Sequence, residues 1–279
     1  MSQHRVVIEP KSIQRNYWKD IWKFRELFYF LAWRDLLVRY KQTAIGVLWS
    51  ILRPLLTLSV MAFIGWLFES NVPEGTPRLL LVAAATLPWT FFSTAFSESA
   101  GSLITNSNLL TKVYFPRMIV PASTIIVCLV DFLISFVLFL ILMLIYQYSP
   151  GWQILMLPLF LLLALVAAFG AGIYIAALNV KYRDFRYIVP FIVQFGLYVS
   201  PIAFASTDIY HNERIPEFAK WVYSMNPMVS VIDGFRWCLL GNTEIYWPGF
   251  LLSFAMSTIL LLYGIRYFRK TERTFADII

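Results

Sequence analysis

Residues 34–54 read RDLLVRYKQTAIGVLWSILRP, and this stretch passes from charged and aromatic residues into the first long apolar segment of the chain. A helix needs about 20 apolar residues to cross a hydrocarbon core that is about 30 Å thick. Six segments meet this requirement: 47–68, 79–96, 119–146, 154–178, 188–205 and 250–268. Polar and helix-breaking residues interrupt the fifth, so we expect it to face protein or a water-filled lumen.

The composition agrees with this interpretation. The 279 residues are 59% hydrophobic and 14% charged, which leaves too little polar surface to cover a soluble globule. The net charge of +7 comes from basic residues spread beside the apolar segments, so we predict no nucleic-acid partner. The sequence therefore predicts an all-α integral membrane protein with six transmembrane helices. Its parts are a cytoplasmic arm (1–46), a membrane domain (47–268) and a cytoplasmic tail (269–279).

Lysines and arginines set the predicted orientation. They are concentrated in the arm, in the loops after the second and fourth segments and in the tail, whereas the other loops carry Asp and Glu. The positive-inside rule then places both termini in the cytoplasm. Residues 18–40 alternate aromatic and basic side chains, which predicts an amphipathic helix along the cytoplasmic membrane surface that contacts membrane lipids. A simple membrane anchor is the alternative.

Two loops are expected to form short helices. In the loop of about 101–117, Ser107 or Asn108 can cap a helix, Pro116 ends it, and its apolar face has no use in a solvated loop. The external segment of about 206–249 contains a partly apolar stretch, broken at Asn226-Pro227, that predicts two short helices dipping into the outer leaflet.

Three features within the apolar segments are candidates for function. Asp131 is an intramembrane carboxylate and so a functional candidate, with a packing hydrogen bond to Ser, Thr or Tyr as the alternative. Ala168, Gly172 and Ala176 repeat at four-residue spacing, which favours close helix packing within the chain. Aromatic stripes along 187–198 and 49–63 indicate either packing and lipid contact or a conduit for sugars, which present C–H faces and hydroxyls.

Motifs of common enzymes are missing from the sequence. It has no phosphate-binding loop of the G-x-x-x-x-G-K-[ST] type and no G-x-S-x-G motif. Its two histidines, His4 and His211, lie on opposite sides of the predicted membrane. We therefore predict no enzyme activity, no catalytic residue, no metal site and no cofactor bound by this chain.

Four motifs carry a family resemblance: RDLLVRYKQTAIGVLWSILRP, LLTKVYFPRMIVP (109–121), NVKYRDFRYIVPF (179–191) and SMNPMVSVIDGFRW (224–237). In this order they resemble the permease subunit of bacterial ABC exporters for cell-envelope polysaccharides, which export O-antigen, capsule and wall teichoic acid. The resemblance covers essentially the whole chain. It implies the type-2 ABC exporter permease fold, the bacterial inner membrane, a homodimer, two separate ATPase subunits that bind ATP and Mg, and an undecaprenyl-type lipid-linked glycan as substrate.

The resemblance also implies roles for individual residues. A cytoplasmic entrance for the lipid pyrophosphate would contain Arg34, Arg39 and Tyr40. Two arginines there suit a phosphate independently of the family, and pairing with Asp35 or with lipid headgroups is the alternative. A channel between the first segment of one subunit and the fifth of the other would be lined by Trp49, Arg53, Phe63, Tyr187, Phe191, Gln194, Phe195 and Tyr198.

Coupling and gating residues follow from the same resemblance. Residues 108–116 match the coupling helix that contacts the ATPase, through Asn108, Leu109, Leu110, Lys112, Tyr114 and Phe115. Lys181, Tyr182, Arg183 and Asp184 match a second ATPase contact, and Asn226, Pro227 and Arg236 match the external gate helices. Two other classes stay open: an ABC permease for a small amphipathic lipid or drug, and a membrane-embedded glycan-modifying enzyme. The enzyme would need intramembrane acid, base or histidine clusters, which the sequence lacks.

Overall fold

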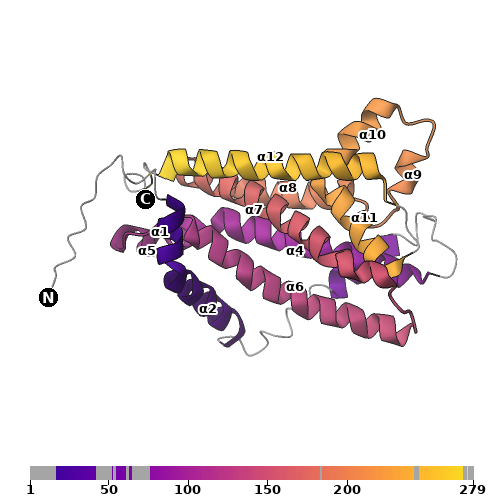
Figure 1. Cartoon of the computed structure of the whole chain (residues 1–279), viewed down its shortest axis with the longest axis horizontal. Helices are drawn as coiled ribbons and strands as arrows, with labels where there is room; N and C mark the ends of the chain where they lie inside the picture. The colour runs from indigo at the N-terminus through magenta and orange to yellow at the C-terminus, as the bar shows by residue number, and fades with distance from the viewer. Residues whose placement is uncertain are drawn as a thin grey trace.

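The computed structural model describes residues 17–41, 52, 55–60, 63–64, 76–182, 184–241, 245–272 and 275. Its main helices run lengthwise beside one another in a bundle (Figure 1). In chain order the elements are α1 (Tyr17–Lys23), α2 (Arg25–Lys41), α4 (Arg78–Thr105), α5 (Ser107–Lys112), α6 (Ile119–Ile145), the 3₁₀ helix η2 (Trp152–Met156), α7 (Leu157–Lys181), α8 (Phe185–Val199), α9 (Thr207–Tyr210), α10 (Glu217–Ser224), α11 (Pro227–Leu240) and α12 (Trp247–Thr271).

Four helical runs are long and apolar enough to cross a membrane. They are α4, α6, the continuous run from η2 through α7, and α12. They coincide with the predicted segments 79–96, 119–146, 154–178 and 250–268, and α4 continues past the predicted end to Thr105. The chain is therefore a multi-pass membrane protein.

The other two predicted spans differ from this group. Segment 47–68 lies largely outside the described residues. In place of a span over 188–205 the structure has α8, an apolar helix of 15 residues that ends at Val199. The helix stops because Pro201 disfavours helical geometry at the residue before it, and Ser200 is extended with φ −85° and ψ 150°. At about 1.5 Å per residue, α8 is about 22 Å long, which is shorter than the predicted span.

The two ends of the bundle carry different sets of short elements. Figure 1 shows α1, α5 and the end of α12 gathered at one end, and α9, α10 and α11 at the other. We call these the α5 end and the α11 end. This grouping is the same as the one that the loop charges predicted.

The centre of the bundle is α4, which packs against α6, α7 and α11. Every residue of α4 from Leu80 to Trp89 is buried. Small residues bring neighbouring helices into near backbone contact. A Cβ on Gly172 of α7 would lie 2.7 Å from the side chain of Ser99 on α4, and a Cβ on Gly264 of α12 would lie 2.4 Å from the carbonyl oxygen of Gly170. Ala168 and Ala176 of the same helix are fully buried. The predicted packing role of these three small residues is thus confirmed.

The break predicted at Asn226-Pro227 separates α10 from α11. The Asn226 side chain accepts a hydrogen bond from the backbone N–H of Met228 at 3.0 Å, and Pro227 occupies the first helical position. The helix ends at Gly241, whose φ of 71° favours glycine. Because these signals are local, the sequence predicted both short helices.

Candidate functional site

Arg39, near the end of α2, is the centre of a polar cluster that joins three helices. Its guanidinium donates to Asp131 of α6 at 2.5 Å and to Glu98 of α4 at 2.7 Å. The hydroxyl of Tyr40 donates to the second oxygen of Asp131. The side chains of Arg39 and Asp131 are 29% and 26% exposed, so this ion pair is largely removed from water. We call Arg39, Tyr40, Glu98 and Asp131 the α2 latch.

The α2 latch provides the partners of Asp131, the carboxylate within an apolar helix. Asp131 lies twelve residues into α6, which places it about 18 Å along the helix. The predicted hydrogen bond to a tyrosine of a neighbouring helix is confirmed by Tyr40. The ion pair with Arg39 and the second acidic residue, Glu98, were not predicted. Glu98 lies in the part of α4 beyond residue 96, outside the predicted segment 79–96.

The other predicted entrance residue, Arg34, is also paired. Its guanidinium donates to Asp35 at 2.6 and 2.8 Å and to the side-chain oxygen of Asn106 at 2.7 Å. Asn106 lies between α4 and α5, so Arg34 ties α2 to the start of α5. The alternative prediction for Arg34, pairing with Asp35, is therefore confirmed. Pairing does not exclude phosphate, because a guanidinium has five N–H donors.

Helix α8 presents an aromatic stripe to the outside of the single chain. The exposed members are Tyr187, Phe191, Phe195 and Tyr198, each between 61% and 78% exposed, and Phe191 and Phe195 stack with ring centroids 6.0 Å apart. Gln194 is exposed beside them, and Phe63 is a further exposed aromatic residue. Only Val189 of α8 is fully buried. The packing reading of this stripe within one chain is thus wrong, which leaves lipid, a second chain or a substrate as what it contacts.

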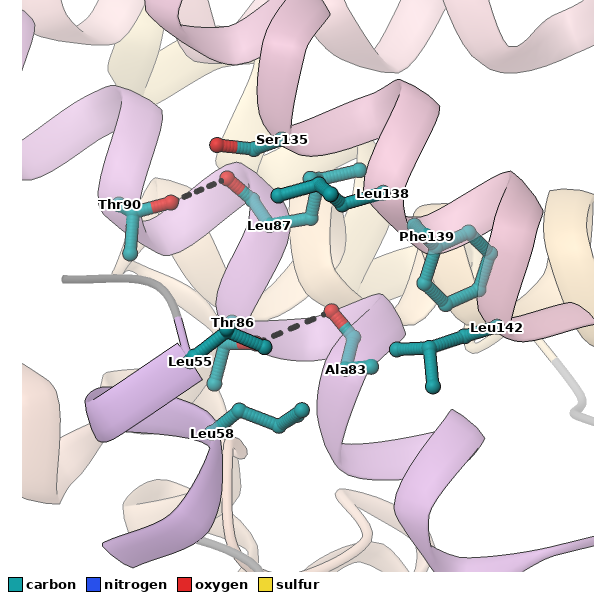
Figure 2. Close-up of a pocket in the computed structure, with 10 residues that line it drawn as sticks. All are labelled: Leu55, Leu58, Ala83, Thr86, Leu87, Thr90, Ser135, Leu138, Phe139 and Leu142. Carbon is teal, nitrogen blue, oxygen red and sulfur yellow. Dashed lines mark hydrogen bonds between the residues drawn. The ribbon is translucent and has the colours of Figure 1, made fainter. Parts of the chain in front are cut away.

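Figure 2 shows a pocket between residues 55–58, α4 and α6. Three hydroxyl groups line it, but each donates to a carbonyl of its own helix: Thr86 to Ala83, Thr90 to Leu87, and Ser135 to Asp131. The other lining residues are apolar. The pocket therefore offers a hydrocarbon surface and no acid, base or metal ligand.

The short helix α5 shows which predicted coupling residues a partner can reach. Asn108, Lys112, Val113 and Tyr114 are exposed at the α5 end of the bundle. Leu110 and Phe115 are buried and belong to a cluster with Phe268 of α12. The predicted apolar face is thus divided, because half of it packs inward against the bundle. Helix α5 itself is shorter than the predicted loop, since α4 occupies residues up to Thr105.

The second predicted ATPase contact joins α7 to α8. Lys181, Tyr182 and Asp184 are all exposed, and the Lys181 ammonium lies 5.0 Å from the ring centroid of Tyr182. Arg183, like Trp49 and Arg53 of the predicted channel, lies outside the described residues.

The predicted gate residue Arg236 is one of the most buried side chains in the described part of the protein, at 2% exposure. Its guanidinium donates to three backbone carbonyls: Leu81 at 3.3 Å, Phe204 at 2.9 Å and Ile202 at 3.0 Å. It thereby fastens α11 to α4 and to the segment after α8. Burial keeps Arg236 away from any solute in this state, and Asn226 serves as the cap of α11.

Among the described residues, no group of three or more His, Cys, Asp or Glu side chains is placed to hold a metal ion. The interhelical pairs of the α2 latch and of Arg34 hold helices together.

Comparison with known proteins identifies relatives along most of the chain. The family described as ABC-2 type transporter matches residues 26–240. An O-antigen export system permease protein RfbA from Klebsiella pneumoniae is 29% identical over 259 residues, which cover 91% of this chain and 95% of the relative. The RfbA protein of Myxococcus xanthus is 26% identical, with 93% and 97% covered. The polysialic acid transport protein KpsM of Escherichia coli is 24% identical, with 86% and 91% covered.

The family match covers nearly all of α2 and the whole of α4, α5, α6, α8 and α11. It therefore includes every residue of the α2 latch. It spans well over half of the residues. The chain therefore belongs to the ABC-2 type transporter family.

Proposed function

We propose that this chain is the membrane-spanning subunit of an ABC exporter that carries a lipid-linked polysaccharide out through the bacterial inner membrane. The observation that carries the proposal is the similarity, over about nine-tenths of the chain, to proteins named for export of O-antigen and transport of polysialic acid. Both are long glycans. O-antigen is the first candidate because its exporters are more similar to this chain, with capsule and teichoic acid as the related possibilities.

The aromatic stripe of α8 supports a sugar substrate. Tyr and Phe rings stack against the C–H faces of sugars, while Tyr198 and Gln194 can bond their hydroxyls. A homodimer with two-fold symmetry would bring two such stripes into one assembly. In this proposal α8 of one subunit and the first span of the other form the channel, with Trp49, Arg53 and Phe63 on the opposite wall.

The α2 latch and Arg34 support an entrance at the α5 end. The lipid-linked glycan has an anionic pyrophosphate, and an arginine already bonded to carboxylates can exchange one of them for a phosphate. We propose that Arg34, Arg39 and Tyr40 receive the pyrophosphate in this way. The apolar pocket beside Ser135, one helical turn from Asp131, offers hydrocarbon contact on the same helix.

ATP binding and hydrolysis belong to two separate ATPase subunits in this proposal. The surface that they contact consists of the exposed residues Asn108, Lys112 and Tyr114 of the α5 region, with Lys181 and Asp184 beside it. Leu109 is half-buried and packs against the buried cluster that contains Leu110. Leu110 and Phe115 act behind this surface, since both are packed inside the bundle. In this proposal the α5 end and both termini face the cytoplasm, because Lys and Arg are concentrated in the arm, in the loops at this end and in the tail.

At the α11 end the same proposal assigns the gate to α10 and α11. Asn226 and Pro227 form the joint between these two helices, and Arg236 anchors α11. A gate that opens to the outside would then move α10 relative to α11.

Export in living cells tests the proposal. The gene is deleted and restored as wild type, as Tyr198→Ala or as Phe254→Ala, with equal membrane levels. Phe254 is a matched control because it is an exposed aromatic residue on α12. We expect deletion to leave full-length lipid-linked glycan inside the cell, and wild type and Phe254→Ala to restore its export. Tyr198→Ala should export about two- to tenfold less, the loss expected for an aromatic contact worth about 0.5–1.5 kcal/mol. Unchanged surface glycan on deletion would contradict the proposal and favour the small-lipid or drug permease.

A further inference from the structure

The end of α12 closes over the loop that joins α5 to α6. The carboxylate oxygen Oε1 of Glu272 accepts a hydrogen bond from the backbone N–H of Arg117 at 2.7 Å. In return, the guanidinium of Arg117 donates to the backbone carbonyl of Glu272 at 3.0 Å. Two hydrogen bonds in opposite directions therefore fasten the last helix to a loop that lies 155 residues earlier.

Aromatic rings complete this junction. The Arg117 guanidinium lies 5.7 Å from the ring centroid of Phe275, and Phe275 packs edge to face on Phe268 at 5.5 Å. Both phenylalanines are fully buried. The Arg269 guanidinium lies 4.8 Å from the ring centroid of Tyr17. The α5–α6 loop, the end of α12 and α1 thus pack together as one unit, which we call the tail junction.

The junction includes the inward side of α5. Leu110 of α5, together with Phe115 and Met118 of the loop, lies in the same buried cluster as Phe268 and Phe275. The outward side, with Lys112 and Tyr114, stays exposed. A displacement of α5 is therefore passed to α12 through these packed side chains when the α5–α6 loop keeps its position relative to α12.

We propose that Glu272 is a positioning residue for energy coupling: its carboxylate fixes the α5–α6 loop against the end of α12, so that movement of α5 is passed to the bundle. This inference rests on the proposed function, in which an ATPase moves α5. A carboxylate that accepts from a backbone N–H makes a charge-assisted bond, and it holds the main chain of the loop rather than a mobile side chain. Packed contacts of this kind transmit displacement because they shift between discrete arrangements instead of deforming gradually.

Three variants separate positioning from a general effect on folding. Glu272→Ala removes the acceptor, whereas Glu272→Gln keeps an oxygen at the same reach and loses only the charge. Glu213→Ala is the matched control, because Glu213 is exposed at the α11 end. Each variant is purified with the ATPase subunit bound, and ATP hydrolysis is measured alongside glycan export in cells at equal membrane level.

We expect Glu272→Ala to hydrolyse ATP within about twofold of wild type and to export at least about fivefold less glycan per ATP, as an uncoupled transporter would. Glu272→Gln should recover most of the export, and Glu213→Ala should match wild type. Equal export per ATP in Glu272→Ala would overturn the inference. A parallel fall of export and hydrolysis, which signals loss of folded protein, would overturn it as well.

A distance measurement tests the positioning step without ATPase or glycan. Spin labels are attached at Lys112→Cys on α5 and Arg266→Cys on α12, both exposed positions, in chains diluted with unlabelled protein. The native Cys128 and Cys238 are buried and need no removal. Glu272→Ala should broaden the distance distribution, and Glu272→Gln should leave it as in wild type. An unchanged distribution in Glu272→Ala overturns the inference, whereas absence of glycan export by wild type contradicts the proposed function alone.

Discussion

The guanidinium of Arg39, near the end of α2, lies 2.5 Å from the carboxylate of Asp131, well inside α6. This pair explains how an acidic residue is tolerated within an apolar helix. A charge at that depth is costly unless it is paired and hydrogen-bonded. Arg39 donates to one carboxylate oxygen of Asp131, and Tyr40 donates to the other. The pair also fixes α2 to the bundle, with Glu98 holding the same guanidinium from α4.

Removing Arg39 should therefore cost more than removing Asp131. Arg39→Ala leaves the carboxylates of Asp131 and Glu98 without their shared cation, and we expect a loss of about 1–3 kcal/mol in stability. Asp131→Asn keeps an oxygen for Arg39 and should cost less. The double variant Arg39→Ala, Asp131→Asn should be more stable than Arg39→Ala alone, because it relieves the unpaired charge. Thermal unfolding of the detergent-solubilised protein measures all three.

An exposed ion pair supplies the control for the α2 latch. Lys220 and Glu217 are 2.8 Å apart on α10, but Glu217 is 76% exposed. Glu217→Gln should change stability by less than about 0.5 kcal/mol, because solvent screens exposed pairs. Strictly additive effects of Arg39→Ala and Asp131→Asn would show that the two residues are not energetically coupled.

Close packing of α7 and α12 depends on Gly264. An added Cβ there would come within 2.4 Å of a backbone oxygen of α7, so Gly264→Ala should force the helices apart and cost about 1–3 kcal/mol. Gly101 on α4 has no neighbouring atom within 4 Å of an added Cβ. Gly101→Ala should be neutral or stabilise by up to about 1 kcal/mol through helix propensity. Melting temperatures that fall equally for the two variants would contradict the close contact.

Arg236 should be essential for the fold of the α11 end. Arg236→Ala removes the guanidinium donor from three carbonyls and leaves Asp233 buried without its nearby cation, with an expected cost of about 3–5 kcal/mol. Arg236→Lys should recover only part of the stability that Arg236→Ala loses, because an ammonium group lacks the planar arrangement of five N–H donors of a guanidinium. Arg214→Ala, at an exposed position of the same end, should stay within about 0.5 kcal/mol of wild type. Normal folding of Arg236→Ala, seen as an unchanged melting temperature, would rule out the anchoring role.

Glu272 should make stability depend on pH. Burial raises the pKa of its carboxyl above the ordinary value, although the Arg117 backbone N–H and the nearby Tyr17, Arg117 and Arg269 oppose the shift. A carboxyl whose pKa is raised by folding binds its proton more tightly in the folded state, so its contribution to stability grows as the pH falls through that raised pKa. Lowering the pH from 7.5 to 5 should therefore favour wild type relative to Glu272→Gln. Parallel melting curves across this range would show that the carboxyl does not titrate as described.

Local signals explain which parts of the fold the sequence predicted. Asn226 and Pro227 mark the start of α11 by capping chemistry that acts within two residues, and long apolar runs mark α4, α6, α7 and α12. The length of α4 was underestimated because Glu98 and other polar residues follow Phe96. Glu98 pairs with Arg39 of α2, and Asn106 accepts from Arg34 of the same helix, and a sequence window cannot reveal these contacts between distant segments.

The sequence predicted which charged residues belong to the candidate site, but it did not predict which residues they contact. Arg34, Arg39 and Asp131 were singled out as charges near or in the membrane, but their partners Asn106 and Glu98 come from tertiary contacts. The burial of Leu110, Phe115 and Arg236 also depends on packing between helices distant in sequence. Glu272 gave no sequence signal, since a single acidic residue in a basic tail resembles a solvated charge. Its contact partner Arg117 lies 155 residues earlier in the chain.

The central claim is that the polysaccharide passes along α8, and photocrosslinking during export tests it most directly. A photoactivatable amino acid replaces Phe191, or Phe254 as the control, in cells that are exporting glycan. The account predicts a covalent adduct of the chain that carries polysaccharide at Phe191 and none at Phe254. An adduct of equal yield at both positions, or one found only at Phe254, would contradict the claim.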